Sequence, residues 1–356
     1  MEDKEQKSNG GLSQDDESTL MWQFGRGPNA VTEYLFGEPS LDCSSDDKKV
    51  AALSDEEKRT ISKMVHFFLQ ARYEKASAEA ERCLNSPYPE IRIFALLAHA
   101  IANVAQNNIE IAQKDFQTLQ REAQHPENER SAALNDVYRF ILSVFFHLGD
   151  DIAPIPPNNL LYCSEGIRLY IMYARSYSLY LKQQYAQALG VAEAALIMAT
   201  DRHPIISLYL NVTASMAAIN LSQFEQADRF FLNALEIAKP EGYIQPFIGH
   251  HGPLQGLVEK HIREKEPELY KLIAENVVRF RHGWTEVHNP QSSNKVTNLL
   301  TPYEFALAMM AAKGKTNQEI ADYFYISIST VKSYLSVVYQ KLGITKRSEL
   351  DKYLNK

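Results

Sequence analysis

The chain of 356 residues has little cysteine, little glycine and no long apolar run, and each shortage excludes a class of protein. Its three cysteines, Cys43, Cys83 and Cys163, lie far apart and form no CxxC pair. This excludes a disulfide framework and a thiolate zinc site, and it favours reduced thiols. The longest apolar stretch, residues 93–105, is interrupted by polar side chains and is too short to cross a bilayer. The polar, acidic first residues are unlike a secretory signal. We therefore expect a cytoplasmic protein that does not use a membrane.

The chain as a whole has no excess of positive charge, but its C-terminal end does. With 37 Lys and Arg against 44 Asp and Glu, the net charge is −7, which by itself argues against a nucleic-acid partner. Residues 296–356 nevertheless carry eight basic and five acidic side chains, a net +3, so the remaining chain carries −10. This asymmetry indicates a nucleic-acid-binding C-terminal end. Residues 1–52 form an acidic arm that we expect to lower non-specific DNA affinity.

Strand patterns are absent between residues 53 and 284, so we predict an all-α fold. No segment there alternates apolar and polar side chains, and the whole chain has only 15 glycines. One spacing, with apolar or small residues at offsets 0, 3, 7 and 10, recurs at steps of 36, 76 and 39 residues, and the step of 76 corresponds to two units. These offsets share one helical face. The spacing occurs at Tyr73, Ala76, Ala80, Cys83; Ile109, Ala112, Phe116, Leu119; Tyr185, Ala188, Ala192, Ala195; and Phe224, Ala227, Phe231, Ala234. A weaker unit fits residues 137–150.

This spacing resembles tetratricopeptide-type repeats, although glycine is missing at the usual hairpin turns. The resemblance implies helical hairpins stacked into a solenoid with a concave surface for a peptide, a protein partner or a small ligand. We expect this repeat domain over residues 53–285. Two further helices are predicted at 254–263 and 267–281. A polar linker follows at 286–298, and a separate domain occupies 299–356.

The C-terminal segment has the start and stop signals of four short helices. Thr301, followed by a proline and Glu304, predicts one helix start, and Thr316 with Glu319 predicts a second. Gly314 and Gly343 predict helix ends. Ser327 can cap a third helix, from 328 to 342, and a fourth is expected from 345 to about 354. A short helix, a tight turn and a longer helix are typical of a helix-turn-helix unit.

The third predicted helix has two different faces. At 100° per residue, Val331, Leu335, Val338 and Leu342 fall on one side and should face the core. The opposite side carries small or polar residues flanked by two lysines, which is the layout of a recognition helix in a DNA groove. This side and its flanks comprise Lys332, Ser333, Ser336, Val337, Gln340 and Lys341.

These segments resemble the LuxR-type DNA-binding domain. The resemblance rests on residues 300–304 (LTPYE), 317–321 (NQEIA), 326–327 (IS), 330–335 (TVKSYL) and 341–344 (KLGI). Residues 238–247 and 252–254 also resemble the junction of MalT-like regulators, which connects a superhelical repeat domain to such a domain. The resemblance implies that the polar side of the third helix enters the major groove of double-stranded DNA. It also implies that Thr316, Asn317 and Gln318 contact phosphate and that the fourth helix pairs two subunits on DNA.

The sequence departs from the LuxR pattern at four positions. Tyr303 replaces a usual arginine, Tyr334 a frequent histidine, Val337 a frequent asparagine and Gln340 a frequent basic residue. Each basic side chain that is replaced removes a possible contact to a DNA phosphate. The departures therefore predict a low, salt-dependent affinity for DNA. They also motivate an alternative function, an interaction scaffold whose C-terminal domain mainly dimerises or docks on another regulator.

The ATPase module of full MalT-like proteins is not readable in this chain. The segment Gly314-Lys315-Thr316 imitates the end of a phosphate loop, but position 309 is methionine rather than glycine and no strand precedes it. No receiver-type alternation of strands and helices occurs either. Because no catalytic spacing of Ser, His and Asp is recognisable, we expect no enzyme, no cofactor and no metal.

Two other clusters are candidate sensor sites. The tyrosines at 170, 173, 177 and 180 form one helical stripe with Arg175 nearby. The residues Tyr170, Tyr173, Tyr177, Tyr180 and Arg175 could line an effector groove, or the stripe could be solenoid core. The pair His250 and His251 lacks a third metal ligand and is expected in a solvated loop. The sequence therefore predicts a bacterial, cytoplasmic one-component transcription regulator, homodimeric on DNA, whose repeats sense an effector of unknown identity.

Overall fold

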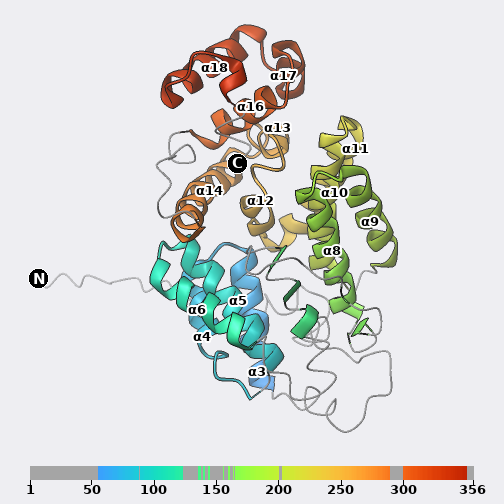
Figure 1. Ribbon diagram of the computed structural model, residues 1–356, viewed down its shortest axis with the longest axis vertical. Helices are drawn as coiled ribbons and strands as arrows, with labels where there is room; N and C mark the ends of the chain where they lie inside the picture. The colour runs from blue at the N-terminus through green and yellow to red at the C-terminus, as the bar shows by residue number, and fades with distance from the viewer. Residues whose placement is uncertain are drawn as a thin grey trace, which may run out of the picture.

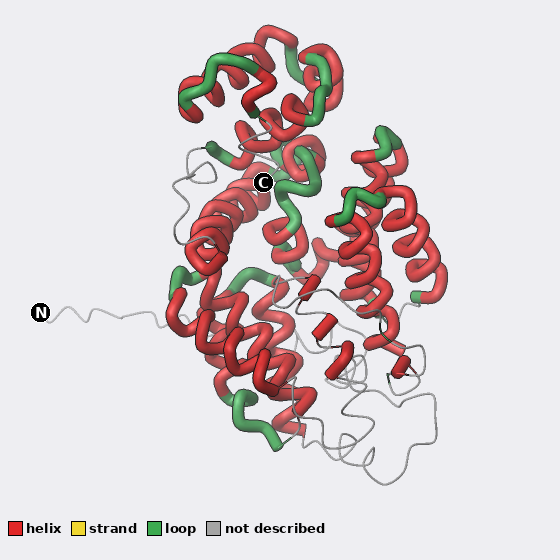
Figure 2. Tube along the Cα trace, in the orientation of Figure 1, coloured by secondary structure: helices red, strands yellow, loops and turns green. Residues whose placement is uncertain are grey.

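The computed structural model describes residues 55–87, 89–122, 165–199, 203–288 and 300–350, with eleven further positions between 135 and 163. Every element within these residues is helical, which confirms the all-α prediction (Figure 2). The acidic arm lies outside the described residues, and so do most of the weak unit at 137–150 and the second half of the predicted fourth helix. None of the described helices has the length and apolar character needed to traverse a bilayer.

The N-terminal and middle parts of the chain form successive pairs of helices. They are α3 (Asp55–Leu69) with α4 (Tyr73–Glu81), α5 (Pro89–Ala105) with α6 (Ile109–Glu122), α8 (Glu165–Leu181) with α9 (Tyr185–Met198), and α10 (Pro204–Asn220) with α11 (Phe224–Ala238). Each helix packs mainly on its neighbours in sequence, as expected of stacked hairpins. Each of the four spacing motifs starts the second helix of a pair, and its small residues are buried.

All four pairs have the same turn between their helices. Ala71, Asn107, Gln183 and Ser222 each adopt a left-handed conformation, with φ between 57° and 62°. In the α10–α11 turn, Ser222 N–H donates to the Ile219 carbonyl and Gln223 N–H to the Ala218 carbonyl, and the other three turns repeat this pattern. This is the Schellman arrangement, in which glycine is usual. The fold therefore keeps the hairpin geometry although the sequence lacks the glycine.

A central segment joins the two halves of the repeat body (residues 55–288). It comprises η3 (Lys239–Glu241), α12 (Gln245–Gly249), α13 (Leu257–Ile262) and α14 (Pro267–His288). α12 contacts α3, α10 and α14, and Ile244 N–H donates to the Leu69 carbonyl (2.8 Å). α13 is shorter than the predicted 254–263 helix, because Gly256 takes a left-handed conformation, whereas α14 extends beyond the predicted end at 281.

α14 lies against the N-terminal half at one very close contact. A Cβ atom added at Gly283 would lie 1.8 Å from the Val104 carbonyl oxygen of α5, so only glycine allows the two helices to approach this closely. Phe280 and Trp284 stack beside it (ring centroids 5.7 Å apart) and cover the apolar cluster of α5 and α6.

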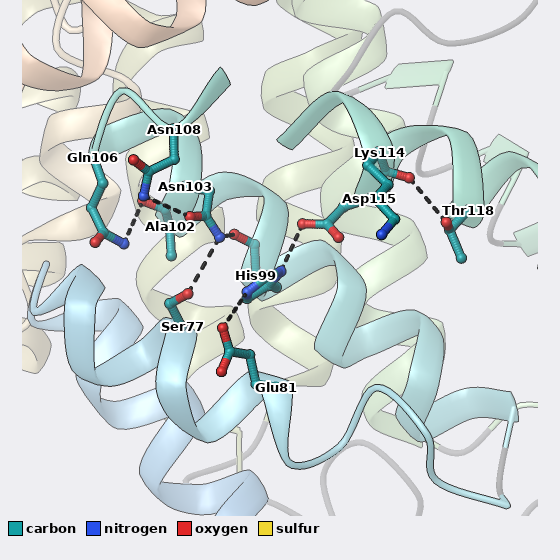
Figure 3. Close-up of polar contacts among 10 residues, drawn as sticks. All are labelled: Ser77, Glu81, His99, Ala102, Asn103, Gln106, Asn108, Lys114, Asp115 and Thr118. Carbon is teal, nitrogen blue, oxygen red and sulfur yellow. Dashed lines mark hydrogen bonds and ion pairs between the residues drawn. The ribbon is translucent and has the colours of Figure 1, made fainter. Parts of the chain in front are cut away.

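The N-terminal half contains its own buried polar cluster, between α4, α5 and α6 (Figure 3). His99 Nδ1 lies 2.7 Å from Asp115 Oδ2, and His99 Nε2 lies 3.5 Å from Glu81 Oε1. Burial alone would lower the pKa of His99, but the hydrogen bonds and charges of Asp115 and Glu81 outweigh it and raise that pKa. The His99 imidazole thus connects three helices of this half.

The C-terminal helix-turn-helix domain (residues 300–350) comprises α16 (Pro302–Ala312), α17 (Asn317–Phe324), α18 (Ile328–Leu342) and the short η4 (Arg347–Glu349). It lies at one end of the molecule, above α13 and α14 (Figure 1). Its core is continuous with the second half of the repeat body, because one apolar cluster runs from Val65 through α8–α13 to Leu350.

Candidate nucleic-acid interface

Local hydrogen bonds fix the starts and ends of the three main helices. Thr301 and Glu304 form a reciprocal capping box on α16, and Thr316 with Glu319 forms another on α17. The Ser327 hydroxyl accepts from Thr330 N–H at the start of α18. Gly314 and Gly343 have φ of +84° and +65° and end their helices. The caps predicted from the sequence are therefore present.

α18 has the two faces that its sequence predicts. Its buried residues are Val331, Leu335, Val338 and Leu342, the four positions assigned to the core. The residues on the opposite side are exposed: Lys332, Ser333, Ser336, Val337 and Gln340. The repeat body leaves this side uncovered. An exposed strip of small polar groups with a lysine at its margin can approach base edges and phosphates.

The remaining predicted DNA contacts are engaged in bonds within the domain. Lys341 Nζ lies 2.8 and 2.6 Å from the two carboxylate oxygens of Glu304. At the start of α17, Thr316 is exposed, Asn317 Oδ1 accepts from Arg347 Nη1 (2.9 Å), and Gln318 Nε2 donates to Asp322 (2.7 Å). Arg347 also donates to the carbonyls of Ala311 and Lys315. These bonds hold the start of α17 in place.

The helix-turn-helix domain docks on the repeat body through an aromatic face that the sequence analysis did not identify. The Arg263 guanidinium lies 4.0 Å from the Tyr303 ring centre, and hydrogen bonding to Tyr334 helps to raise the pKa of Arg263 against the opposing effect of burial. Tyr303 and Tyr334 pack edge to face, 5.0 Å apart. The two departures from the LuxR pattern at these positions therefore form one contact with the repeat body.

A second contact involves α16 and the half-buried Arg281 of α14. Its guanidinium lies 4.0 Å from the centre of the Phe305 ring, and its Nη2 lies 2.9 Å from His251 Nδ1. Because a guanidinium only donates, Nδ1 accepts, and His251 Nε2 carries the proton that bonds Glu259 Oε1 (2.7 Å). Burial lowers the pKa of Arg281 to about 10, although Glu259 opposes the shift. The arginine therefore remains charged at neutral pH. His251 lies between its guanidinium and the Glu259 carboxylate.

A third contact places the end of α17 on α11 and α13. Lys260 Nζ lies 4.7 Å from the Tyr323 ring centre, and the Phe224 and Tyr323 rings are 5.9 Å apart. Phe324 lies directly on Gly256, where an added Cβ atom would be 2.3 Å from the ring. We call Tyr303, Phe305, Tyr323, Phe324 and Tyr334 the docking face. Its sequence signal was the pair of departures from the LuxR pattern at Tyr303 and Tyr334.

Two lysines next to the start of α17 reach across to the repeat body. Lys313 Nζ donates to Asn220 Oδ1 (2.5 Å) and Lys315 Nζ to Ser222 Oγ (3.1 Å). Lys315 also lies 4.7 Å from the Phe224 ring centre. Burial lowers the pKa of Lys313 to about 8. The α10–α11 turn thus holds both ammonium groups beside the helix start that is predicted to contact phosphate.

The tyrosine stripe packs against the chain itself. Tyr173 and Tyr180 are buried and Tyr170 and Tyr177 are half-buried, whereas Arg175 is exposed. Tyr173 and Tyr177 of α8 contact His250, which follows α12. The structure brings the four tyrosines together and leaves Arg175 apart from them.

The expectation that His250 and His251 lie in a solvated loop is wrong, because both are buried. The Pro246 carbonyl only accepts, so His250 Nδ1 carries the proton (2.9 Å) and Nε2 accepts from the Tyr173 hydroxyl (3.3 Å). Burial lowers the pKa of His250 to about 4. Within the described segments, no three His, Cys, Asp or Glu side chains come together as metal ligands would.

Comparisons with known proteins identify the C-terminal end. Residues 298–354 match the family described as bacterial regulatory proteins, luxR family. The chain is 30% identical over 92 residues to the transcriptional regulatory protein LiaR of Bacillus subtilis, covering 26% of this chain and 40% of LiaR. It is 38% identical over 58 residues to the transcriptional regulatory protein ComA of the same organism, covering 16% of this chain and 27% of ComA. The chain thus spans less than half the length of these relatives. No solved structure matches the chain significantly.

Proposed function

We propose that this chain is a sequence-specific DNA-binding transcriptional regulator whose helical repeat body controls its C-terminal domain. The single observation that carries the proposal is the exposed polar side of α18, which the docked body leaves open, on a domain that matches the luxR family. The capped helices, the local net charge of +3 and the match to two transcriptional regulatory proteins support it. We further propose a homodimer on DNA and cytoplasmic action.

The proposed effector of the repeat body is a small ligand, a peptide or a protein. Because the tyrosine stripe packs on the segment that includes α12 and His250, an effector that reached these tyrosines would have to compete with that segment. Such a competitor would loosen the packing between α8, α10 and the central segment. The proposal therefore connects effector binding to the part of the body on which the helix-turn-helix domain rests.

DNA binding can be tested with charge reversals on two exposed helix faces. The full chain should enrich a preferred duplex from a random-sequence library at low salt. Lys332→Glu with Ser336→Glu should weaken binding to that duplex at least 100-fold, because each lost base or phosphate contact costs about 1–3 kcal/mol. Lys114→Glu with Gln117→Glu changes the net charge equally on exposed positions of α6 and should have little effect.

The same variants test the alternative of a docking scaffold. If the C-terminal domain acts mainly by binding another regulator, the α18 reversal would leave regulation intact in cells. No enrichment of any duplex by the wild-type chain would contradict the DNA-binding proposal.

A further inference from the structure

We propose that the interface between the repeat body and the docking face is a closed state, in which Lys313 and Lys315 are withheld from DNA, and that opening this interface increases DNA affinity. The inference rests on the proposed DNA-binding function and assigns the regulatory step to a named contact. It differs from a blocked recognition helix, because the polar side of α18 is exposed in this structure.

The first argument is the place where the two ammonium groups are held. Both lysines precede α17, whose start is the predicted phosphate contact, and both point instead to oxygens of the α10–α11 turn. Lys315 is additionally held by the Phe224 ring and by Glu319, 3.8 Å away. A lysine that neutralises a phosphate must give up such contacts, so in this arrangement neither group is available to DNA.

The second argument is the chemistry of the interface. The body contributes three cations, Lys260, Arg263 and Arg281, that lie on aromatic rings of the domain. In the reverse direction, Lys315 of the domain lies on the Phe224 ring of the body. Contacts of this kind are individually weak, so each of them can be broken when the domain moves away from the body. The contact is not a general attraction between an acidic body and a basic domain, because cations lie on both sides of it and face aromatic rings or neutral polar groups.

The third argument is that polar groups at this interface remain unpaired. Among the described residues of the interface, Tyr323 OH and Glu259 Oε2 are buried without a hydrogen-bond partner. A buried polar group without a partner destabilises the closed arrangement, because it has lost the hydrogen bonds that water would make. Opening the interface would hydrate them, which offsets part of the lost aromatic contact. Weak cation–aromatic contacts and unpaired polar groups together make an interface that can open and close.

The salt dependence of DNA binding measures the withheld lysines directly. The probe is a 30-bp duplex of random sequence, titrated with the full chain at several salt concentrations. Each phosphate neutralised contributes about −0.9 to the slope of log K against log salt. Lys313→Gln with Lys315→Gln keeps donors for Asn220 and Ser222. In the wild-type chain these changes should leave the slope unchanged. A slope shallower by up to about 1.8 would overturn the inference, because the lysines would then already contact DNA.

The opened state can be produced at Gly256. Gly256→Ala drives a methyl group into the Phe324 ring, whereas Gly242→Ala imposes a similar left-handed strain with only a flexible glutamine 3.8 Å away. Hydrogen exchange of residues 300–326 reports opening. In the Gly256→Ala variant, these residues should exchange faster and the chain should bind the duplex more tightly. The slope of log K against log salt should be steeper by up to about 1.8. Adding Lys313→Gln and Lys315→Gln to this variant should remove both the gain in affinity and the steeper slope. Gly242→Ala should change neither the hydrogen exchange of residues 300–326 nor the affinity for the duplex.

The outcomes separate this inference from the proposed function. An opened Gly256 variant that binds with unchanged affinity and slope overturns the closed-state inference and leaves DNA binding standing. If neither the wild-type nor the opened chain binds any duplex at low salt, the proposed function itself fails.

Discussion

The two faces of the helix-turn-helix domain differ in composition and in what covers them. The side of α18 that points away from the body is small, polar and exposed. The docking face is aromatic and buried or half-buried, and it contacts Lys260, Arg263 and Arg281. One face contributes little to stability and is suited to an external partner. The other makes the domain part of the core of the repeat body. The face that packs on the body and the face that stays open to an external partner therefore belong to different sides of one small domain.

The largest expected effect is on the docking face. Phe324→Ala should lower the free energy of unfolding by about 4 kcal/mol, because it removes a buried ring between Gly256, Tyr303 and Tyr323. Urea unfolding followed by circular dichroism measures the loss. The adjacent Tyr325 is 79% exposed, and Tyr325→Ala should change stability by less than about 0.5 kcal/mol. Equal losses in the two variants would mean that the face is not docked in solution.

A smaller effect separates neighbouring residues of α18. Val338 is fully buried, and Val338→Ala should cost about 2 kcal/mol of stability. Val337 is 39% exposed, and Val337→Ala should leave stability unchanged while weakening DNA binding by about fivefold at a thymine-containing site. Thermal unfolding and titration of the selected duplex measure the two properties. A stability loss at Val337 would contradict the assignment of the faces.

The third prediction uses pH to test Lys313. Its pKa is about 8 in the docked structure and about 10.5 in the unfolded chain. Between these values the unfolded chain binds more protons, so stability rises with pH in that window. We expect a gain of about 1 kcal/mol between pH 7 and pH 9 from this residue. The Lys313→Gln variant lacks the titrating group and should show a smaller rise. Identical pH profiles would show that Lys313 is solvated.

The smallest predicted effect is the pairing of Arg263 with Tyr303. A double-mutant cycle with Arg263→Ala and Tyr303→Leu should give a coupling energy of about 0.5–1 kcal/mol, the strength of a partly exposed cation–π contact. Urea unfolding of the four proteins measures it. A coupling energy of zero would remove this contact from the docking interface, although the other two cation–π contacts would remain.

The features that the sequence predicted correctly are those that depend on residues close together in the chain. The caps at Thr301, Thr316 and Ser327 and the four core positions of α18 follow from neighbours within a few residues. The starts of α4, α6, α9 and α11 follow from the repeat spacing for the same reason. These features depend on helical periodicity, which a sequence displays directly.

Contacts between distant segments could not be predicted in this way. Arg263 and Tyr303 are forty positions apart, and nothing in their spacing indicates that a cation of α13 meets a ring of α16. His250 and His251 follow a glycine and precede another, which is typical of an exposed loop, yet the central segment carries them inside the body. In the sequence, Tyr303 and Tyr334 stood out only as departures from a family pattern. Their partner, Arg263, became evident only from the structure.

The shared core has a consequence for how such chains can evolve. Recombination can exchange a C-terminal domain between chains that share this fold. A domain from another source would bring its own residues at positions 303, 305 and 324, opposite Arg263, Arg281 and Gly256. Mismatched surfaces would leave apolar rings in water or cations under bulky side chains. Body and domain are therefore expected to be inherited together, and substitutions on one side should be followed by compensating changes on the other.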